Sequence, residues 1–271
     1  MKSTDTLTHP FDLATDLTGG DEGRFTGQTA AAYTNMVGPF GGITAATLLR
    51  AVIDDPRRIG EPLSITVNYA GPIADGPFTI DAIPARTNRS TQHWTLTLTQ
   101  HDAIATTATV VTGLRRPTWS DTEIAPPAAP PADEVPITPL PEYPAWMRNY
   151  EMRFVEGGEI LSATPQPHTT STTTLWVRDT PARPLDHTAL TALSDVFFPR
   201  IMLRLGRFVA ASTVSLTTYF HTDLSPTSDR PILATARAQH FGNGYFDQSA
   251  QLWSEDGKPL ATSHQLVYFK D

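Results

Sequence analysis

The sequence contains no cysteine among its 271 residues. Disulfide frameworks, thiolate zinc sites and cysteine nucleophiles are therefore excluded. Long hydrophobic runs are also missing: the longest candidate, Ile43 to Ile53, is interrupted by polar residues, whereas about 20 apolar residues are needed to cross a bilayer. Lysine occurs only at Lys2, Lys258 and Lys270, and 28 acidic against 20 basic residues give a net charge of -8. We therefore expect neither a nucleic-acid partner, which normally needs a basic surface, nor a membrane partner.

Several catalytic motifs are absent too. The sequence has no G-x-S-x-G nucleophile elbow, no H-E-x-x-H pair of metal ligands and no Walker loop. The segment Gly242-Asn243-Gly244 lacks the third glycine and the following helix of a dinucleotide loop, so it predicts a hairpin turn instead. We expect no metal and no cofactor.

Neither end of the sequence matches a known targeting signal. The segment from Met1 to Leu17 has acidic residues where a secretory signal has its apolar core. The last three residues, Phe269-Lys270-Asp271, match no peroxisomal or retention signal. We therefore expect a cytoplasmic protein.

Proline is concentrated in one stretch, from Arg116 to Pro144, which holds nine of the 24 prolines. Proline fixes φ and removes a backbone donor, so this stretch cannot form a central strand or a helix interior. It predicts an extended, semi-rigid connector. We therefore divide the chain into an N-terminal unit (1–116), a connector (117–144) and a C-terminal unit (145–271).

Both units show the same order of elements. In the first, Phe40-Gly41-Gly42 opens a helical pattern from Ile43 to Ile53, in which apolar residues recur every three positions. In the second, a helical pattern runs from the predicted N-cap Asp186 to Leu205, with a break expected at Pro199. Alternating and turn-bounded segments predict strands after these helices, and one before the second helix: 63–69, 78–86, 92–100, 104–113, 169–178, 212–221, 232–239, 245–253 and 259–269.

Two pairs of segments repeat at nearly one separation. Ser64 to Tyr69 corresponds to Ser215 to Phe220, and the sequence Ile104-Ala105-Thr106-Thr107 corresponds to Leu260-Ala261-Thr262-Ser263. Such repetition indicates a duplicated unit. A single helix followed by an antiparallel meander fits an α+β packing in which the sheet wraps the helix.

This arrangement resembles the double hot-dog fold of acyl-CoA thioesterases, and the second half resembles the bacterial type II acyl-CoA thioesterase family. The resemblance implies two units, each with a long helix wrapped by an antiparallel sheet, merged into one continuous sheet. It also implies hydrolysis of acyl-CoA at a site formed by Asp195 on the helix, Thr213 on the next strand and Gln265 on the last strand. The stretches that carry it are Trp176-Val177-Arg178, Ser194 to Pro199, Thr213 to His221 and Asp256 to Gln265. The first half has no counterpart of the three residues, since the repeat places Thr109 opposite Gln265, so one active site is implied in the second half.

The residue types suit thioester hydrolysis. Asp195 could accept a proton from water, while Gln265 and Thr213 fix the water without adding charge. The mechanism needs burial to raise the pKa of Asp195, because an ordinary aspartate is a weak base. Gly41 and Gly42, at a helix start, are candidates for binding the oxyanion with backbone N–H groups. Strict alternation would turn Thr213 away from the core, so its role requires a β-bulge or a crevice.

Alternatives remain open at this point. The three polar residues could be vestigial in a non-catalytic protein that binds acyl thioesters or lipophilic ligands. An enoyl-thioester hydratase would need an Asp–His pair, for which the adjacent Asp186-His187 is poorly arranged. Further association into a dimer or larger homo-oligomer is expected from this fold. Any of seven arginines could contact CoA phosphates, although most are expected in surface ion pairs: Arg86, Arg89, Arg115, Arg116, Arg200, Arg204 and Arg207.

Overall fold

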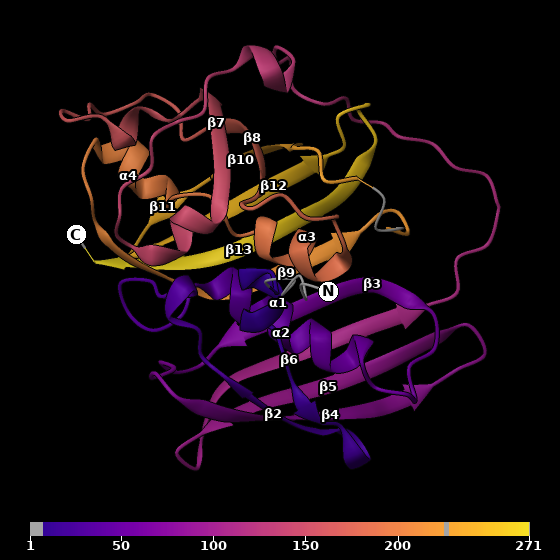
Figure 1. Cartoon of the computed structure of the whole chain (residues 1–271). Helices are drawn as coiled ribbons and strands as arrows, with labels where there is room; N and C mark the ends of the chain where they lie inside the picture. Colours follow the sequence, from indigo (N-terminus) through magenta and orange to yellow (C-terminus); the bar gives the residue numbers. More distant parts are fainter. Residues whose placement is uncertain (1–7, 225–227, 271) are drawn as a thin grey trace, which may run out of the picture.

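One antiparallel sheet of 13 strands encloses the helices (Figure 1). The computed structural model describes residues 8–224 and 228–270. Residues 1–7 and 271, on which the expected lack of a targeting signal partly depends, lie outside that description. No helix within the described ranges is long and apolar enough to cross a membrane. Few helices and one large sheet confirm the predicted α+β class.

The strands follow the sequence pattern closely, and all the long ones predicted are present. The helices are α1 (Pro10–Ala14), α2 (Gly41–Ile53), α3 (His187–Leu193) and α4 (Arg200–Leu205). The strands of the first half are β1 (Thr18–Gly19), β2 (Arg24–Gln28), β3 (Glu61–Tyr69), β4 (Pro77–Thr87), β5 (Thr91–Gln100) and β6 (Ala103–Gly113). Those of the second half are β7 (Tyr150–Glu156), β8 (Thr173–Asp179), β9 (Ala210–Phe220), β10 (Ile232–Arg237), β11 (Phe241–Gly242), β12 (Tyr245–Trp253) and β13 (Pro259–Lys270). The sequence pattern did not indicate α1, β1, β2, β7 or β11.

The two halves join along one seam. The sheet order is β1-β2-β4-β5-β6-β3-β9-β13-β12-β10-β8-β7, with β11 paired to β12, so β3 and β9 lie at its centre (Figure 1). These are the repeated segments found in the sequence, and they pair with each other. Thr66 lies opposite Thr217, with their hydroxyl oxygens 3.1 Å apart. Since the repeat makes these two threonines equivalent, a pseudo-two-fold axis passes between them.

Helix α2 is buried on nearly every side. The sequence predicts a single apolar stripe, yet Thr44 and Thr47 are buried as well as the aliphatic residues. Their hydroxyls donate to the carbonyls of Phe40 and Ile43 one turn earlier, which satisfies these polar groups inside the core. The helix is enclosed because the sheet covers one side and α3 packs on another (Figure 1).

The second helix breaks earlier than expected. Asp186 does cap α3, accepting a hydrogen bond of 2.8 Å from the N–H of Ala189, but α3 ends at Leu193 and α4 begins only at Arg200, after Pro199. The expected break at Pro199 is present, but the prediction that the helix runs up to it and carries Asp195 was wrong. Asp195 lies in the turn that ends α3.

The connector runs along the outside of the second half (Figure 1). It contains one short 3-10 turn, Ala132–Glu134. Ala132 and Val135 are buried against Trp176 and Trp253 on the outer side of the sheet, and the indole N–H of Trp176 donates to the carbonyl of Pro130 at 2.9 Å. The segment is thus attached to the second half by specific contacts.

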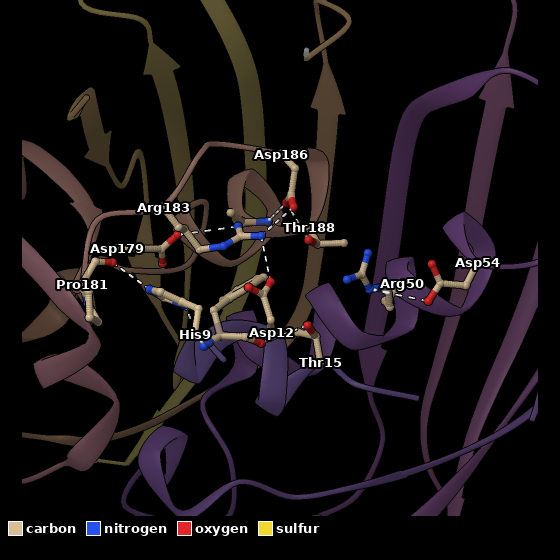
Figure 2. A network of polar contacts seen from close by, with 12 residues as sticks. His9, Asp12, Thr15, Arg50, Asp54, Asp179, Pro181, Arg183, Asp186 and Thr188 are labelled. Atoms are coloured by element: carbon tan, nitrogen blue, oxygen red, sulfur yellow. Dashed lines mark hydrogen bonds and ion pairs between the residues drawn. The ribbon is translucent and has the colours of Figure 1, made fainter. Parts of the chain in front are cut away.

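A charged network ties α1 to the second half (Figure 2). The guanidinium of Arg183 donates to Asp12 of α1 at 2.9 Å and to Asp186 at 2.8 Å, and it lies 4.7 Å from the ring centroid of Phe11. Asp179 is 3.8 Å from the same guanidinium. Burial raises the pKa of Asp179 to about 7, with Arg183 opposing this rise. One arginine therefore joins three carboxylates from two parts of the chain.

Candidate active site

The turn that carries Asp195 is fixed by buried hydroxyl groups. Ser194 Oγ donates to the carbonyl of Thr191 at 2.7 Å and lies 2.9 Å from Thr218 Oγ1 on β9. Ser263 Oγ on β13 donates to the carbonyl of Ser194 at 3.4 Å. Because these bonds reach both strands, the turn is held against the sheet, and the carboxylate of Asp195 is directed toward β13.

The three residues expected to form the site form a hydrogen-bonded chain. Gln265 Nε2 donates to Asp195 Oδ1 at 2.8 Å, and Thr213 Oγ1 donates to Gln265 Oε1 at 3.3 Å. The threonine bond matters because a hydroxyl donor at Oε1 sets the orientation of the amide, leaving its N–H₂ toward the carboxylate. Three elements, namely the turn after α3, strand β9 and strand β13, thus bring together residues up to 70 positions apart in the sequence.

A β-bulge at Val214 brings Thr213 to this face. Along β13, Leu266 is paired with Ser215, and the next residue, Val267, with Thr213, so β9 has one extra residue there. The bulge reverses the alternation beyond it. Of the two expected possibilities, a β-bulge or a crevice, the structure has the bulge, although nothing in the sequence located it.

Asp195 has the pKa of a base poised near neutrality. Burial raises its pKa from 3.8 to about 7, while the hydrogen bond from Gln265 and the backbone N–H of Gly42 act in the opposite direction. Desolvation penalises the carboxylate more than these two neutral dipoles favour it. The pKa of this carboxyl group therefore lies much closer to neutrality than that of an exposed aspartate.

The first half supplies the opposite wall of the site. Gly41 and Gly42 begin α2, and a methyl group on the Cα of Gly41 would lie only 2.8 Å from Asp195 Oδ2. A methyl group on Gly42 would lie 2.6 Å from the carbonyl oxygen of Ala192. The glycines therefore allow α2 to approach both α3 and the carboxylate, and each residue of the expected site lies here.

This wall also contains Tyr69, the last residue of β3, which the sequence pattern did not indicate. Its hydroxyl donates to the carbonyl of Gly41 at 2.8 Å. A signal was present in the repeat, where Tyr69 corresponds to Phe220, so the two segments differ there by a single hydroxyl group. The site thus lies between the halves, and the expectation that it belongs to the second half alone was incomplete.

The pseudo-symmetric position in the first half lacks the same chemistry. The pairing of β3 with β6 also shifts, with Leu63 as the extra residue, and this makes Pro62 the counterpart of Thr213. In the same register Val110, opposite Ile65, is the counterpart of Gln265. The sequence comparison had placed Thr109 there, one residue too early. Neither Pro62 nor Val110 has a polar side chain, so the hydrogen-bonded chain has no duplicate there.

Arg200 cannot contact a CoA phosphate, because it is fully buried. Its guanidinium donates to the carbonyls of Phe198 and Ser171 and to Thr173 Oγ1, which anchors the segment following Asp195. Burial lowers the pKa of Arg200 to about 9.

Within the described residues, no group of three or more His, Asp or Glu side chains is arranged to hold a metal ion.

Family models match both halves of the chain. Residues 30–113 match the N-terminal domain of acyl-CoA thioesterases, and residues 122–269 match their C-terminal domain. The chain belongs to the acyl-CoA thioesterase family. The resemblance stated from the sequence is therefore confirmed, and membership of this thioesterase family indicates thioester hydrolysis as the general chemistry. A comparison with functionally curated proteins gave no match.

Solved structures of thioesterases share the fold. A hot-dog protein of unknown function from Alicyclobacillus acidocaldarius is 47% identical, with 98% of this chain and 99% of that chain covered and a TM-score of 0.90. The TesB protein of Mycobacterium avium subsp. paratuberculosis is 19% identical, with 96% and 98% covered and a TM-score of 0.77. The acyl-CoA thioesterase II TesB2 of Mycobacterium marinum is 17% identical, with the same coverage and a TM-score of 0.75. The last two likenesses show the fold alone, and the double hot-dog prediction is confirmed.

Proposed function

We propose that the protein hydrolyses acyl-CoA thioesters to the free acid and CoA, using a water molecule held by Asp195, Gln265 and Thr213. The observation that supports this most is the hydrogen-bonded chain of these side chains, with a desolvated carboxylate at its end. A general base works best when its pKa lies near the operating pH. Burial gives Asp195 that property, whereas an exposed aspartate would be a weak base.

In the proposed reaction, ionised Asp195 takes one proton from the water as its oxygen attacks the thioester carbonyl carbon. The carbonyl π electrons move to oxygen, and the resulting oxyanion is stabilised by the backbone N–H of Gly41 at the start of α2, because the N–H of Gly42 already donates to Asp195. When the intermediate collapses, the C–S bond breaks and the sulfur leaves with the proton held by Asp195. The carboxylate is thereby restored for the next cycle.

Gln265 has a second proton on Nε2 besides the one given to Asp195. That proton is suited to the oxygen of the water, and the hydroxyl of Thr213 keeps the amide from turning over. The two residues thus orient the nucleophile while Asp195 changes charge.

The alternative hydratase chemistry has less support. It would use Asp186 and His187, but the carboxylate of Asp186 accepts hydrogen bonds from Ala189 N, Thr188 Oγ1 and Arg183. These bonds commit it to capping α3 and to the network of Figure 2. Cytoplasmic location and a dimer or larger homo-oligomer stay predictions.

The test is thiol release from a panel of acyl-CoAs of increasing chain length, followed with a thiol reagent. We expect release by the unmodified chain, and a loss of kcat by about 10² to 10⁴-fold in Asp195→Asn. Asp247→Asn, on the same sheet and with its carboxylate accepting backbone N–H groups, is the matched control. Undiminished release in Asp195→Asn would remove Asp195 from its role. Tight acyl-CoA binding without release at any chain length would favour the non-catalytic binding protein.

A further inference from the structure

Tyr69, from the first half of the chain, lies close to the carboxylate of Asp195. Its hydroxyl donates its single proton to the carbonyl of Gly41 at 2.8 Å. Burial raises the pKa of Tyr69 well above its ordinary value, and the nearby charge of Asp195 adds to this effect. The phenol therefore stays protonated across the working pH range, and its one donor is already used. Toward any other group, its oxygen can only accept.

Two oxygens border the same spot beside Gly41. A methyl group on its Cα would lie 2.8 Å from Asp195 Oδ2 and 3.4 Å from Tyr69 Oη. The other carboxylate oxygen, Oδ1, is engaged by Gln265. Oδ2 therefore faces the side on which Tyr69 lies, and glycine at position 41 lets the start of α2 approach both oxygens closely.

We propose that Tyr69 positions the attacking water, by accepting one of its protons while Asp195 Oδ2 accepts the other. This inference rests on the proposed thioester hydrolysis and adds a residue to it from the opposite half of the chain. A water with both protons given to acceptors has only lone pairs left for the thioester carbonyl. During attack, the water proton that faces Asp195 Oδ2 is transferred to the carboxylate. The water proton that faces Tyr69 stays on the oxygen, which becomes part of the acid.

The experiment compares Tyr69→Phe, Gly41→Ala and the double variant in steady-state thiol release. Tyr69→Phe removes the acceptor but keeps the ring, whereas Gly41→Ala keeps the carbonyl that Tyr69 binds and places a methyl group against Oδ2. We expect kcat to fall about 10²-fold in each, with KM changed less than about threefold, because a nucleophile out of position costs about that factor. The double variant is expected to match the worse single variant, because both lose the same water. Tyr219→Phe, an exposed tyrosine on β9, is the control and is expected to keep full activity.

The outcomes separate three cases. If Tyr69 only supports the start of α2, Tyr69→Phe will lower the midpoint of thermal unfolding and raise KM rather than lower kcat alone, and the inference is overturned. Full activity in Tyr69→Phe, with Asp195→Asn inactive, also overturns it and leaves the proposed hydrolysis intact. Activity retained in Asp195→Asn removes both. Thermal unfolding of each variant identifies loss of fold; if Gly41→Ala does not fold, a fall in kcat at constant KM in Tyr69→Phe decides.

Discussion

Replacing Asp195 by asparagine should make the protein more stable while abolishing its activity. The ionised carboxylate of Asp195 lowers the stability of the folded chain, because burial raises its pKa from 3.8 to about 7. Asparagine has nearly the same shape and can still accept the hydrogen bond from Gln265. The substitution therefore removes a desolvation cost and leaves most contacts in place.

The magnitude follows from the pKa difference between the folded and unfolded chains. Each pKa unit corresponds to about 1.4 kcal/mol, so the cost of the carboxylate approaches about 4 kcal/mol at pH 8 and falls to about 1 kcal/mol at pH 4.5. The sign is fixed by proton binding: between about pH 4 and pH 7 the folded state holds a proton on Asp195 that the unfolded state has lost. The free energy of unfolding contributed by this group therefore decreases as pH rises through that window.

The assay is urea denaturation of the unmodified protein and Asp195→Asn at several pH values between 4.5 and 8. The difference between the two proteins is the useful quantity, because other groups such as Asp179 contribute equally to both and cancel. We expect the advantage of the variant to grow with pH and to level off above pH 7. Asp75→Asn, at an exposed carboxylate, is the control and should leave stability almost unchanged. A variant that is less stable at pH 8, or an advantage independent of pH, would refute the claim that Asp195 is desolvated.

Two further predictions concern its neighbours and the network of Figure 2. Gln265→Leu removes a hydrogen bond that lowers the pKa of Asp195, so the rising limb of kcat/KM against pH should move to higher pH; an unchanged midpoint would contradict the contact. Arg183→Met leaves the carboxylates of Asp12 and Asp186 without their shared cation. Arg183 is mostly buried but the two carboxylates are partly exposed, so we expect a loss of about 1 to 3 kcal/mol. A loss of unfolding free energy below about 1 kcal/mol in urea would show that the network contributes little.

The sequence was informative wherever one element buries one face against another. Alternation located Trp94, Leu96 and Leu98, all of which are buried on β5. The repeat predicted the duplicated unit, because both copies bury a helix against a sheet in the same way. The glycine pair before Ile43 likewise marked the start of α2.

The features that could not be predicted from the sequence are those set by contacts between distant segments. Nothing local in the sequence 194–199 shows that α3 must end at Leu193; the turn is held there by Thr218 and Ser263 from the sheet. The bulge at Val214 is likewise visible only in the pairing of β9 with β13. Tyr69 was missed because its partner is the backbone carbonyl of Gly41, 28 positions earlier in the chain, and such a contact makes no pattern along the sequence.

The pairing of β3 with β9 has a consequence for concentration. Asp195 and Gln265 belong to one side of this junction, and Gly41 and Tyr69 to the other, yet both sides are parts of one polypeptide. Their encounter is intramolecular, so dilution cannot separate them as it separates subunits. Catalytic output per chain should therefore stay constant down to the lowest concentrations that can be assayed.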